Sequence, residues 1–281
     1  MPAKTGIRVV LMAFLAAGSA FSVAQAQGIG LQPASVEMEV DAGARMRKVV
    51  TLANVDREKP VSVSLSLADW TQDEAGTVSF GAVEDTGASA VDWVLFSPMT
   101  VSLAPGQTKQ VALDLAAPKS LSRTGDYRFA LVAATVVQDP AGAWKKQQTA
   151  SLFYLTAGEA ASRPRIAASR LTVATDGQPA IGLDFSNTGN AHARLQGTIE
   201  VSGDGGAAFS VPVGEIVVLD GAARSVTVPL GQSLPANPVI EVRLENVFAP
   251  QKDDERQALK PHRVNTETKV ADLAVAVAGQ D

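Results

Sequence analysis

The sequence predicts an all-β protein built from two sandwiches in tandem, and three observations indicate it. Runs rich in Val, Leu and Ala recur along the chain, separated by clusters of Gly, Pro, Asn and Asp. These runs follow one another at intervals of about 8–12 residues, a spacing typical of sandwiches. Several of them alternate apolar and polar residues, a period that fits strands and not helices.

The first half shows the clearest alternation. In residues 61–68, Val61, Val63 and Leu65 fall on one face, and serines fall on the other. Residues 73–92 read as a longer loop. Other strands are expected near residues 35–40, 48–53, 93–96, 101–103, 108–115, 125–137 and 149–155.

The second half repeats this organisation without repeating the sequence. Strands are expected near residues 166–173, 181–186, 195–201, 211–219, 225–229 and 239–244, with a last one at 268–277 after a charged loop at 250–263. Each half therefore holds about seven short strands, which is immunoglobulin-like in outline. We expect a first domain at 27–157, a linker at 158–164 and a second domain at 165–281.

The N-terminus predicts export. Lys4 and Arg8 precede a compact apolar run at residues 9–17, and Ala24-Gln25-Ala26 forms an A-x-A cleavage site. Residues 1–26 thus resemble a cleaved secretory signal peptide, because the apolar run is too short to span a membrane. The chain has no Cys, so it offers no lipoprotein anchor, and we expect no membrane anchor.

Composition narrows the possible partners and cofactors. The formal net charge is −5 and no basic stripe is visible, which argues against a nucleic-acid partner. Without Cys there are no disulfides and no thiolate metal site. Aromatic residues are sparse, and we expect one or two of Trp70, Trp93 and Trp144 to fill a sandwich core.

No catalytic set is visible. The two histidines, His192 and His262, lie in a turn region and a charged loop, and we expect both to be solvated. The acidic run at 253–255 lacks the spacing of a calcium loop, and no nucleophile elbow, phosphate loop or H-E-x-x-H motif occurs. The sequence predicts a binding protein that is not an enzyme and has no metal or cofactor.

A series of motifs in the first half resembles a known family. It comprises Phe96-Ser97-Pro98, the Pro-Gly turn at 104–107 that leads into a strand through Val111, and the strand opening at 125–129. A late strand at 151–154 completes the series. Residues 30–157 are similar in these motifs to the N-terminal domain of periplasmic pilus-assembly chaperones, and 165–278 resemble the second domain more weakly.

The resemblance implies a periplasmic protein that binds exported pilus or fimbrial subunits by donor-strand complementation. The chaperone's last strand of domain one completes a pilin-like subunit through main-chain hydrogen bonds, and an outer-membrane usher is a further implied partner. Here that strand falls on 149–155, and the alternative is that it is buried within its own sandwich. The candidate partner-binding residues are Thr149, Ser151, Leu152, Phe153, Tyr154 and Leu155.

The sequence departs from the family at one functional position. The family anchors the subunit's carboxylate with an Arg on the first strand and a Lys just before the Leu-Phe/Tyr-Tyr run, and neither is present here. Arg45, Arg47 and Lys48 are the candidates to replace them. The absence of the pair favours an alternative function, a structural or adhesive immunoglobulin-like protein of the cell surface, and an exported hydrolase is a third class.

Overall fold

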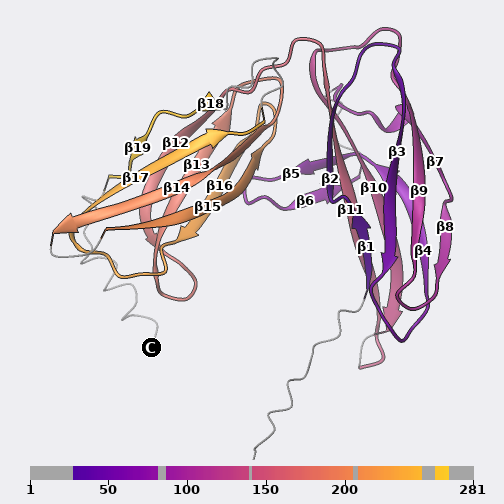
Figure 1. Cartoon of the computed structure of the whole chain (residues 1–281), viewed down its shortest axis with the longest axis horizontal. Helices are drawn as coiled ribbons and strands as arrows, with labels where there is room; N and C mark the ends of the chain where they lie inside the picture. Colours follow the sequence, from indigo (N-terminus) through magenta and orange to yellow (C-terminus); the bar gives the residue numbers. More distant parts are fainter. Residues whose placement is uncertain (1–27, 82–86, 139–140, 205–207, 249–256, 266–281) are drawn as a thin grey trace, which may run out of the picture.

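The computed structural model describes residues 28–81, 87–138, 141–204, 208–248 and 257–265. Within these ranges the chain is almost entirely β-strand, and the short 3₁₀ turn η1 (Val91–Trp93) is the helical element. The strands form two sandwiches, one before residue 158 and one after residue 163, that lie side by side (Figure 1). The all-β class and the tandem sandwiches are confirmed, whereas the predicted leader at 1–26 and last strand at 268–277 lie outside the described residues.

The first sandwich consists of two facing sheets. Its strands are β1 (Ile29–Gln32), β2 (Ser35–Glu39), β3 (Arg45–Asn54), β4 (Val61–Ala68), β7 (Val94–Ser97), β8 (Thr100–Leu103), β9 (Thr108–Ala116), β10 (Gly125–Gln138) and β11 (Trp144–Ala157). One sheet has the order β1-β3-β9-β7 and the other the order β2-β11-β10-β4-β8. A separate hairpin, β5 (Trp70–Gln72) with β6 (Val78–Phe80), extends toward the second sandwich (Figure 1).

Strands β1 and β2 are one segment that serves both sheets. β1 runs antiparallel to β3 in the first sheet, and β2 runs parallel to β11 in the second. The chain crosses between the sheets at Pro33 and Ala34. Pro33 has no backbone N–H group to donate, so at the crossing it interrupts neither ladder of hydrogen bonds. The register of β2 on β11 extends only from Leu152 to Thr156. The crossing therefore determines how much of β11 is covered.

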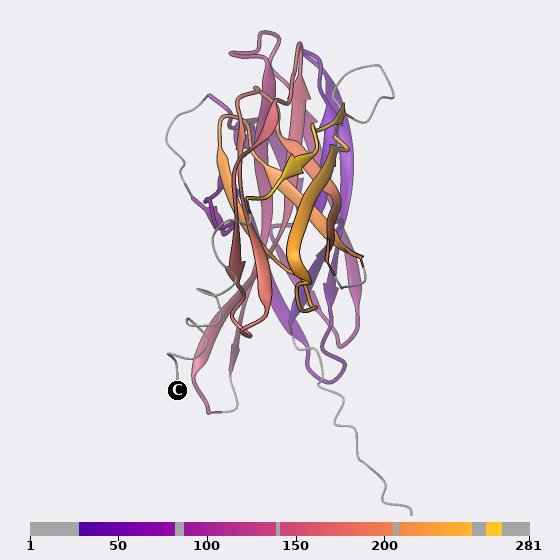
Figure 2. The ribbon, with the colours of Figure 1, turned by 90° about the vertical axis from the view of Figure 1, so that its left-hand side faces the viewer.

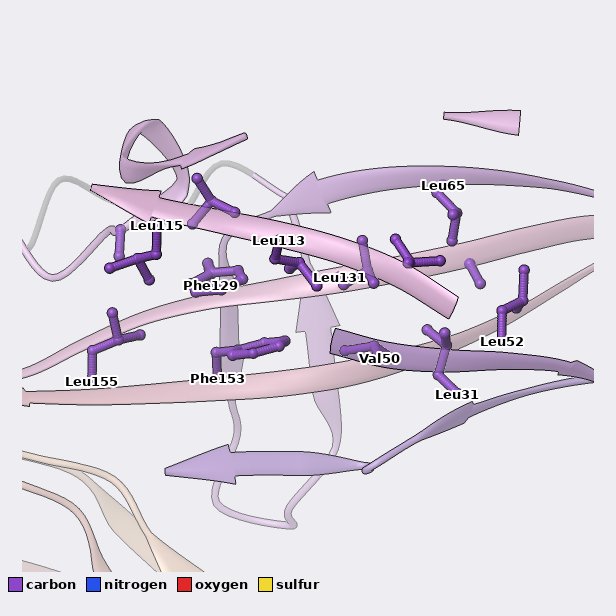
Figure 3. Packing of buried hydrophobic residues seen from close by; sticks show 14 of the residues in the cluster. Leu31, Val50, Leu52, Leu65, Leu113, Leu115, Phe129, Leu131, Phe153 and Leu155 are labelled. Atoms are coloured by element: carbon purple, nitrogen blue, oxygen red, sulfur yellow. The ribbon is translucent and has the colours of Figure 1, made fainter. Parts of the chain in front are cut away.

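Alternating side chains of the two sheets fill the first core. Phe129 on β10 and Phe153 on β11 stack with their ring centroids 4.3 Å apart, and both are fully buried. Leu31, Leu52 and Leu113 pack around them from the facing sheet (Figure 3). Burying such side chains is the dominant stabilising contribution in a chain without disulfides.

The second sandwich is built in the same way. Its strands are β12 (Pro164–Val173), β13 (Pro179–Asn187), β14 (Ala193–Asp204), β15 (Phe209–Val218), β16 (Ala223–Pro229), β17 (Ala236–Asn246), β18 (Gln257–Ala258) and β19 (His262–Arg263). One sheet has the order β12-β13-β16, and the other has β15-β14-β17 with β18 and β19 along the outer edge of β17. Phe185, Ile199 and Val242 are among its fully buried core residues.

Two asparagines hold equivalent corners of the two sandwiches. Asn54 ends β3 and Asn187 ends β13, and each is only 2% exposed. Their Nδ2 groups donate to the carbonyl oxygens of Lys59 at 2.8 Å and of Ala191 at 2.8 Å. Their Oδ1 atoms each accept the N–H two residues further on, as in an Asx turn. The loose internal similarity of the two halves thus has a structural basis.

The two sandwiches meet in a shared apolar cluster. Trp70 and Tyr154 from the first sandwich contact Leu219 from the second, and the two aromatic rings meet edge-on at 5.1 Å. The β5–β6 hairpin adds a backbone hydrogen bond of 2.7 Å from Ser225 N–H to the Glu74 carbonyl. Turned by 90°, the second sandwich lies in front of the outer face of the first (Figure 2). The contacts fix one sandwich against the other.

The structure differs from the sequence-based expectations in three places. The loop expected at 73–92 contains β6 and η1, and the charged loop at 250–263 contains β18 and β19. Strand β11 begins at Trp144, five residues earlier than expected, because its polar first half lacks an apolar signal.

Of the tryptophans, Trp70 is buried against the second sandwich, Trp93 packs at the edge of the first core, and Trp144 is 70% exposed.

Candidate functional site: the open edge of strand β11

Half of strand β11 has a backbone edge with which no other strand of the described residues pairs. β10 pairs with the strand along its full length, from Trp144 to Ala157, but β2 covers the opposite edge only from Leu152 onward. Among the described residues, no strand pairs with Trp144–Ala150 on that side. We call this segment the open edge.

The direction of the backbone groups along the open edge follows from the strand's alternation. The N–H of Leu152 points away from β10 and donates to the Ala34 carbonyl at 2.9 Å. Residues an even number of positions away point the same way, so the backbone groups of Trp144, Lys146, Gln148 and Ala150 also face outward. At about 3.3 Å per residue, the segment offers about 20 Å of strand to an incoming chain.

The residues predicted to bind a partner lie mostly outside this edge. Leu152, Phe153, Tyr154 and Leu155 are flanked by β10 on one side and β2 on the other, so their backbone cannot pair with a third strand. Phe153 and Leu155 are fully buried core residues. For these four residues the alternative, burial within the protein's own sandwich, describes the structure.

The other two predicted residues mark where the covering strand ends. Ser151 is buried, and its hydroxyl donates to the Pro33 carbonyl at 2.6 Å, at the crossing between the sheets. Thr149 lies on the open edge. The open edge therefore overlaps the predicted segment only at residues 149–150, and it extends from there toward the N-terminal end of the strand.

A groove lies on the outer face of this sheet, over β10, between β4 and the open half of β11. Its volume is about 770 Å³, and its lining includes Trp144, Lys146 and Gln148 from β11 together with Ser62 and Ser64 from β4. The loop that follows β3 adds Asp56 and Lys59. The groove therefore borders the outward-facing side chains of the open half of β11, while the unpaired backbone edge lies on the other side of that strand.

One acceptor at the open edge lacks a donor. The side-chain oxygen Oε1 of Gln147 is buried and has no hydrogen-bond partner within the described part of the chain. Leaving such an acceptor unsatisfied costs about 1–3 kcal/mol. A donor brought by another polypeptide would remove this cost.

The candidate replacements for the missing anchor cations lie elsewhere. Arg45, Arg47 and Lys48 belong to β3, in the sheet opposite β11, and Arg47 pairs with Asp114 at 2.6 Å on the surface. They cannot supply a cation beside β11. The cations near the interdomain cleft are instead Arg123, Arg128 and Arg194, which the sequence analysis did not single out as anchor candidates.

The interdomain cleft contains a buried ionisable network. His192 is fully buried, contrary to the prediction of a solvated loop histidine, because its turn packs against the other sandwich. Its Nδ1 lies 2.7 Å from Asp126 Oδ2, and its Nε2 lies 3.3 Å from Glu37 Oε1. Asp126 also accepts the His192 backbone N–H at 2.6 Å and the Thr156 hydroxyl at 3.0 Å. His262 is also not freely solvated, since its Nε2 lies 2.8 Å from the Ser169 hydroxyl.

Burial and charge act in opposite directions on this network. Burial is the largest influence and lowers the pKa of His192, but the hydrogen bonds and charges of Asp126 and Glu37 outweigh it and leave the pKa above the usual 6.5. For Glu37, burial raises the pKa, but the His192 hydrogen bond and the Arg194 charge leave it below the usual 4.5. Burial also raises the pKa of Tyr154 to about 12.

Arginines complete the join between the sandwiches. Arg194 on β14 pairs with Glu37 and Glu215, and its guanidinium lies 5.3 Å from the Tyr154 ring centroid. Arg128 on β10 pairs with Asp220 of the second sandwich, and Arg123 reaches the same carboxylate at 2.8 Å. Each of these guanidinium groups already has a carboxylate partner. The cleft is therefore arranged as a structural join.

The described residues contain no group of three or more His, Cys, Asp or Glu side chains arranged to hold a metal ion. No helix in those same ranges has the length and apolar character needed to cross a membrane. The features that stand out are thus an uncovered strand edge with its groove and a paired, buried join between the domains.

These features define a class of protein: a two-sandwich β protein with a partly uncovered strand. In structure, the chain is similar over most of its length to solved fimbrial chaperones. One is the class 5 fimbriae chaperone CfaA, at 11% identity and a TM-score of 0.42, with 85% of this chain and 99% of that chain covered. Another is the chaperone–tip adhesion subunit pre-assembly complex CsuC–CsuE of Acinetobacter baumannii, at 14% identity and a TM-score of 0.41, covering 83% and 97%.

A third similar structure is the E. coli chaperone DraB, at 10% identity and a TM-score of 0.40, with 83% of this chain and 96% of that chain covered. No family model matches the sequence, and no curated protein matches it. The likenesses found are therefore to solved structures at low sequence identity.

Proposed function

We propose that the protein is a periplasmic chaperone-like binding protein that receives exported pilus or fimbrial subunits on the open edge of β11. The partner is a polypeptide lacking a strand, and binding adds the open edge to the partner's sheet. Catalysis has no part in this function. Export by the leader at residues 1–26 and delivery of the subunit to an outer-membrane usher belong to the same proposal.

The observation that supports the proposal is the uncovered half of β11. A strand edge with unpaired N–H and C=O groups is a template for pairing with another chain. The edge is held rigidly, because β10 pairs with it over its whole length and Phe153 anchors the strand in the core. A preformed edge costs little ordering entropy on binding, and this favours its use as a binding element.

The strand that binds is displaced from the predicted one. Thr149 remains part of it, whereas Leu152–Leu155 serve to anchor the strand in its own sandwich. The crossing at Pro33 and Ala34 sets the division, because it carries β1 away into the facing sheet. The segment we assign to the partner is Trp144–Ala150.

A proline substitution tests this assignment. Gln148→Pro removes an N–H that faces away from β10, so it blocks pairing at the open edge while the β10–β11 ladder keeps its hydrogen bonds. Gln148→Thr is the matched control, because it retains the N–H in a residue that favours strands. Each variant is co-expressed with a pilin-like subunit from the same source, and the subunit's solubility and protease resistance are measured.

We expect the wild type and Gln148→Thr to protect the subunit and Gln148→Pro to lose protection while remaining folded by circular dichroism. Equal solubility and protease resistance of the subunit with and without this protein would refute the function.

The paired join between the sandwiches favours a second candidate function, that of a structural or adhesive surface protein. Arg128–Asp220 and Asp126–His192 hold the two sandwiches against each other, as a rigid spacer requires. A spacer is recovered with fibres or the cell surface, whereas a chaperone remains free in the periplasm. Cell fractionation separates these two functions.

A further inference from the structure

We propose that the segment received by the open edge is an acidic, polar strand and not an alternating apolar one. This inference rests on the proposed function and specifies the class of partner. The side chains of the open edge carry it. Lys145, Lys146, Gln147, Gln148 and Thr149 occupy five consecutive positions, so both faces of the strand present polar groups to a neighbour.

The groove face concentrates positive charge. Lys146 and Lys59 both line the groove, one from β11 and one from the loop that follows β3. The carboxylate facing them is Asp56, whose Oδ1 accepts the backbone N–H groups of Glu58 at 2.8 Å and of Lys59 at 3.0 Å. Asp56 is therefore already engaged by its own loop, and the Lys146 ammonium, on the strand that an incoming chain would flank, favours a carboxylate on that chain.

This local charge contrasts with the rest of the protein. The chain carries a formal net charge of −5, so its overall charge repels acidic polypeptides. An acidic segment is thus attracted at the groove and discouraged elsewhere on the surface. Such a contrast gives a binding site selectivity as well as affinity.

The opposite face calls for hydrogen-bond donors. The buried Oε1 of Gln147 lacks a donor in the described part of the chain, and Gln147 lies between Lys145 and Thr149 on that face. A partner residue with an amide or hydroxyl group next to Gln147 would satisfy it. An apolar strand would leave this acceptor unsatisfied and would bury the Lys146 ammonium without a partner, which is unfavourable.

Trp144 sets the end of the site. It lines the groove and is 70% exposed at the start of β11, where its ring provides apolar surface to a passing chain. The expected partner segment therefore carries Asp or Glu beside Lys146, an amide or hydroxyl side chain beside Gln147, and an apolar side chain beside Trp144.

Three synthetic peptides of ten residues test the inference on the full chain by isothermal titration calorimetry. One is acidic with Asn and Thr neighbours, the second replaces each acid by its amide, and the third alternates Val and Ser. We expect the acidic peptide to bind at least tenfold more tightly than either other peptide at 50 mM salt. Its advantage should shrink at 300 mM salt because the charges are then screened.

The charge reversal Lys146→Glu should abolish the preference for the acidic peptide. Lys109→Glu is the matched control, because it makes the same change in net charge at an exposed lysine of β9, in the facing sheet. This control should retain the preference.

Three results would overturn the inference: a preference for the apolar peptide, equal affinities in Lys146→Glu and the wild type, or no binding of any peptide. If the wild-type protein still protects the subunit in the co-expression experiment, only the inference fails. If the wild-type protein does not protect the subunit, the proposed function fails as well.

Discussion

Replacing His192 tests whether the domain join depends on a charged histidine. In the wild type its Nδ1 lies 2.7 Å from Asp126 Oδ2, and its ring stacks on Phe248 with centroids 3.8 Å apart and lies tilted against Tyr154 at 4.4 Å. His192→Gln keeps a planar polar side chain but removes the titratable ring. The variant therefore separates the contribution of charge from that of shape.

The expected cost follows from these contacts. A hydrogen bond to a charged group contributes about 1.5–3 kcal/mol, and an aromatic pair adds about 0.5–1.5 kcal/mol beyond its buried area. Because glutamine retains part of the packing, we expect a loss of about 3 kcal/mol in the free energy of unfolding at pH 6. For a chain of this size that loss lowers Tm by about 6–12 °C.

The cost should depend on pH in a defined direction. The folded-state pKa of His192 lies above 6.5, so its proton stabilises the fold fully below about pH 6.5 and ceases to do so as pH rises through the folded-state pKa. The pKa of Glu37 is lowered, so its contribution is present above about pH 4.5 and is lost as pH falls through its folded-state pKa. Both contributions to the stability of the wild type should therefore be fully present between about pH 4.5 and pH 6.5.

Calorimetric unfolding from pH 5.5 to 9 provides the measurement. The difference in Tm between wild type and His192→Gln should be largest near pH 6 and should narrow toward pH 9. His262→Gln is the control for loss of a histidine outside the join. A difference that stays constant over the whole range would refute the argument that His192 is held in its charged form.

Three other substitutions test the packing. Phe153→Ala should cost about 3–5 kcal/mol in chemical unfolding, because the side chain is fully buried against Phe129; an exposed binding residue would show almost no loss. Asn54→Ala should cost about 2 kcal/mol by the same assay, since the carbonyls of Lys59 and Ala104 lose their donor, whereas Asn54→Asp should not restore stability. Gly125→Ala should cost roughly 2 kcal/mol or more, because the φ of Gly125 is +97° and a Cβ would lie 2.1 Å from the Asn190 carbonyl oxygen. Separate melting of the two sandwiches in calorimetry would show that this last change has loosened the join, and an unchanged single transition would contradict it.

The sequence was most informative where one face of a strand is buried and the other is solvated. Strand β4 begins and ends at the residues predicted from its alternation, because Val63 and Leu65 point into the core while the serines point out. Strand β10 gives a different pattern, with both faces buried over its first nine residues, since one side meets the core and the other meets the second sandwich. Its apolar run still predicts a strand.

The sequence was least informative where contacts between distant residues decide the outcome. The turn that carries His192 has the composition of a solvated loop, and it is buried only because the first sandwich packs against it. For a similar reason the sequence did not identify the open edge. Apolar character identified residues 149–155 as a strand, but that character belongs to the half anchored in the core, and the uncovered half is polar. Which half β2 covers depends on the crossing at Pro33, which local patterns do not specify.

The position of β1 would constrain maturation of the N-terminus if the predicted leader at 1–26 is cleaved. β1 starts at Ile29, so only Gln27 and Gly28 separate it from the predicted cleavage position after Ala26. A peptidase that cut several residues too late would remove β1, uncover the flank of β3 and take Leu31 out of the core. If the predicted leader is cleaved, accurate cleavage would be a condition for a closed sandwich, and heterogeneous trimming would yield molecules prone to self-association.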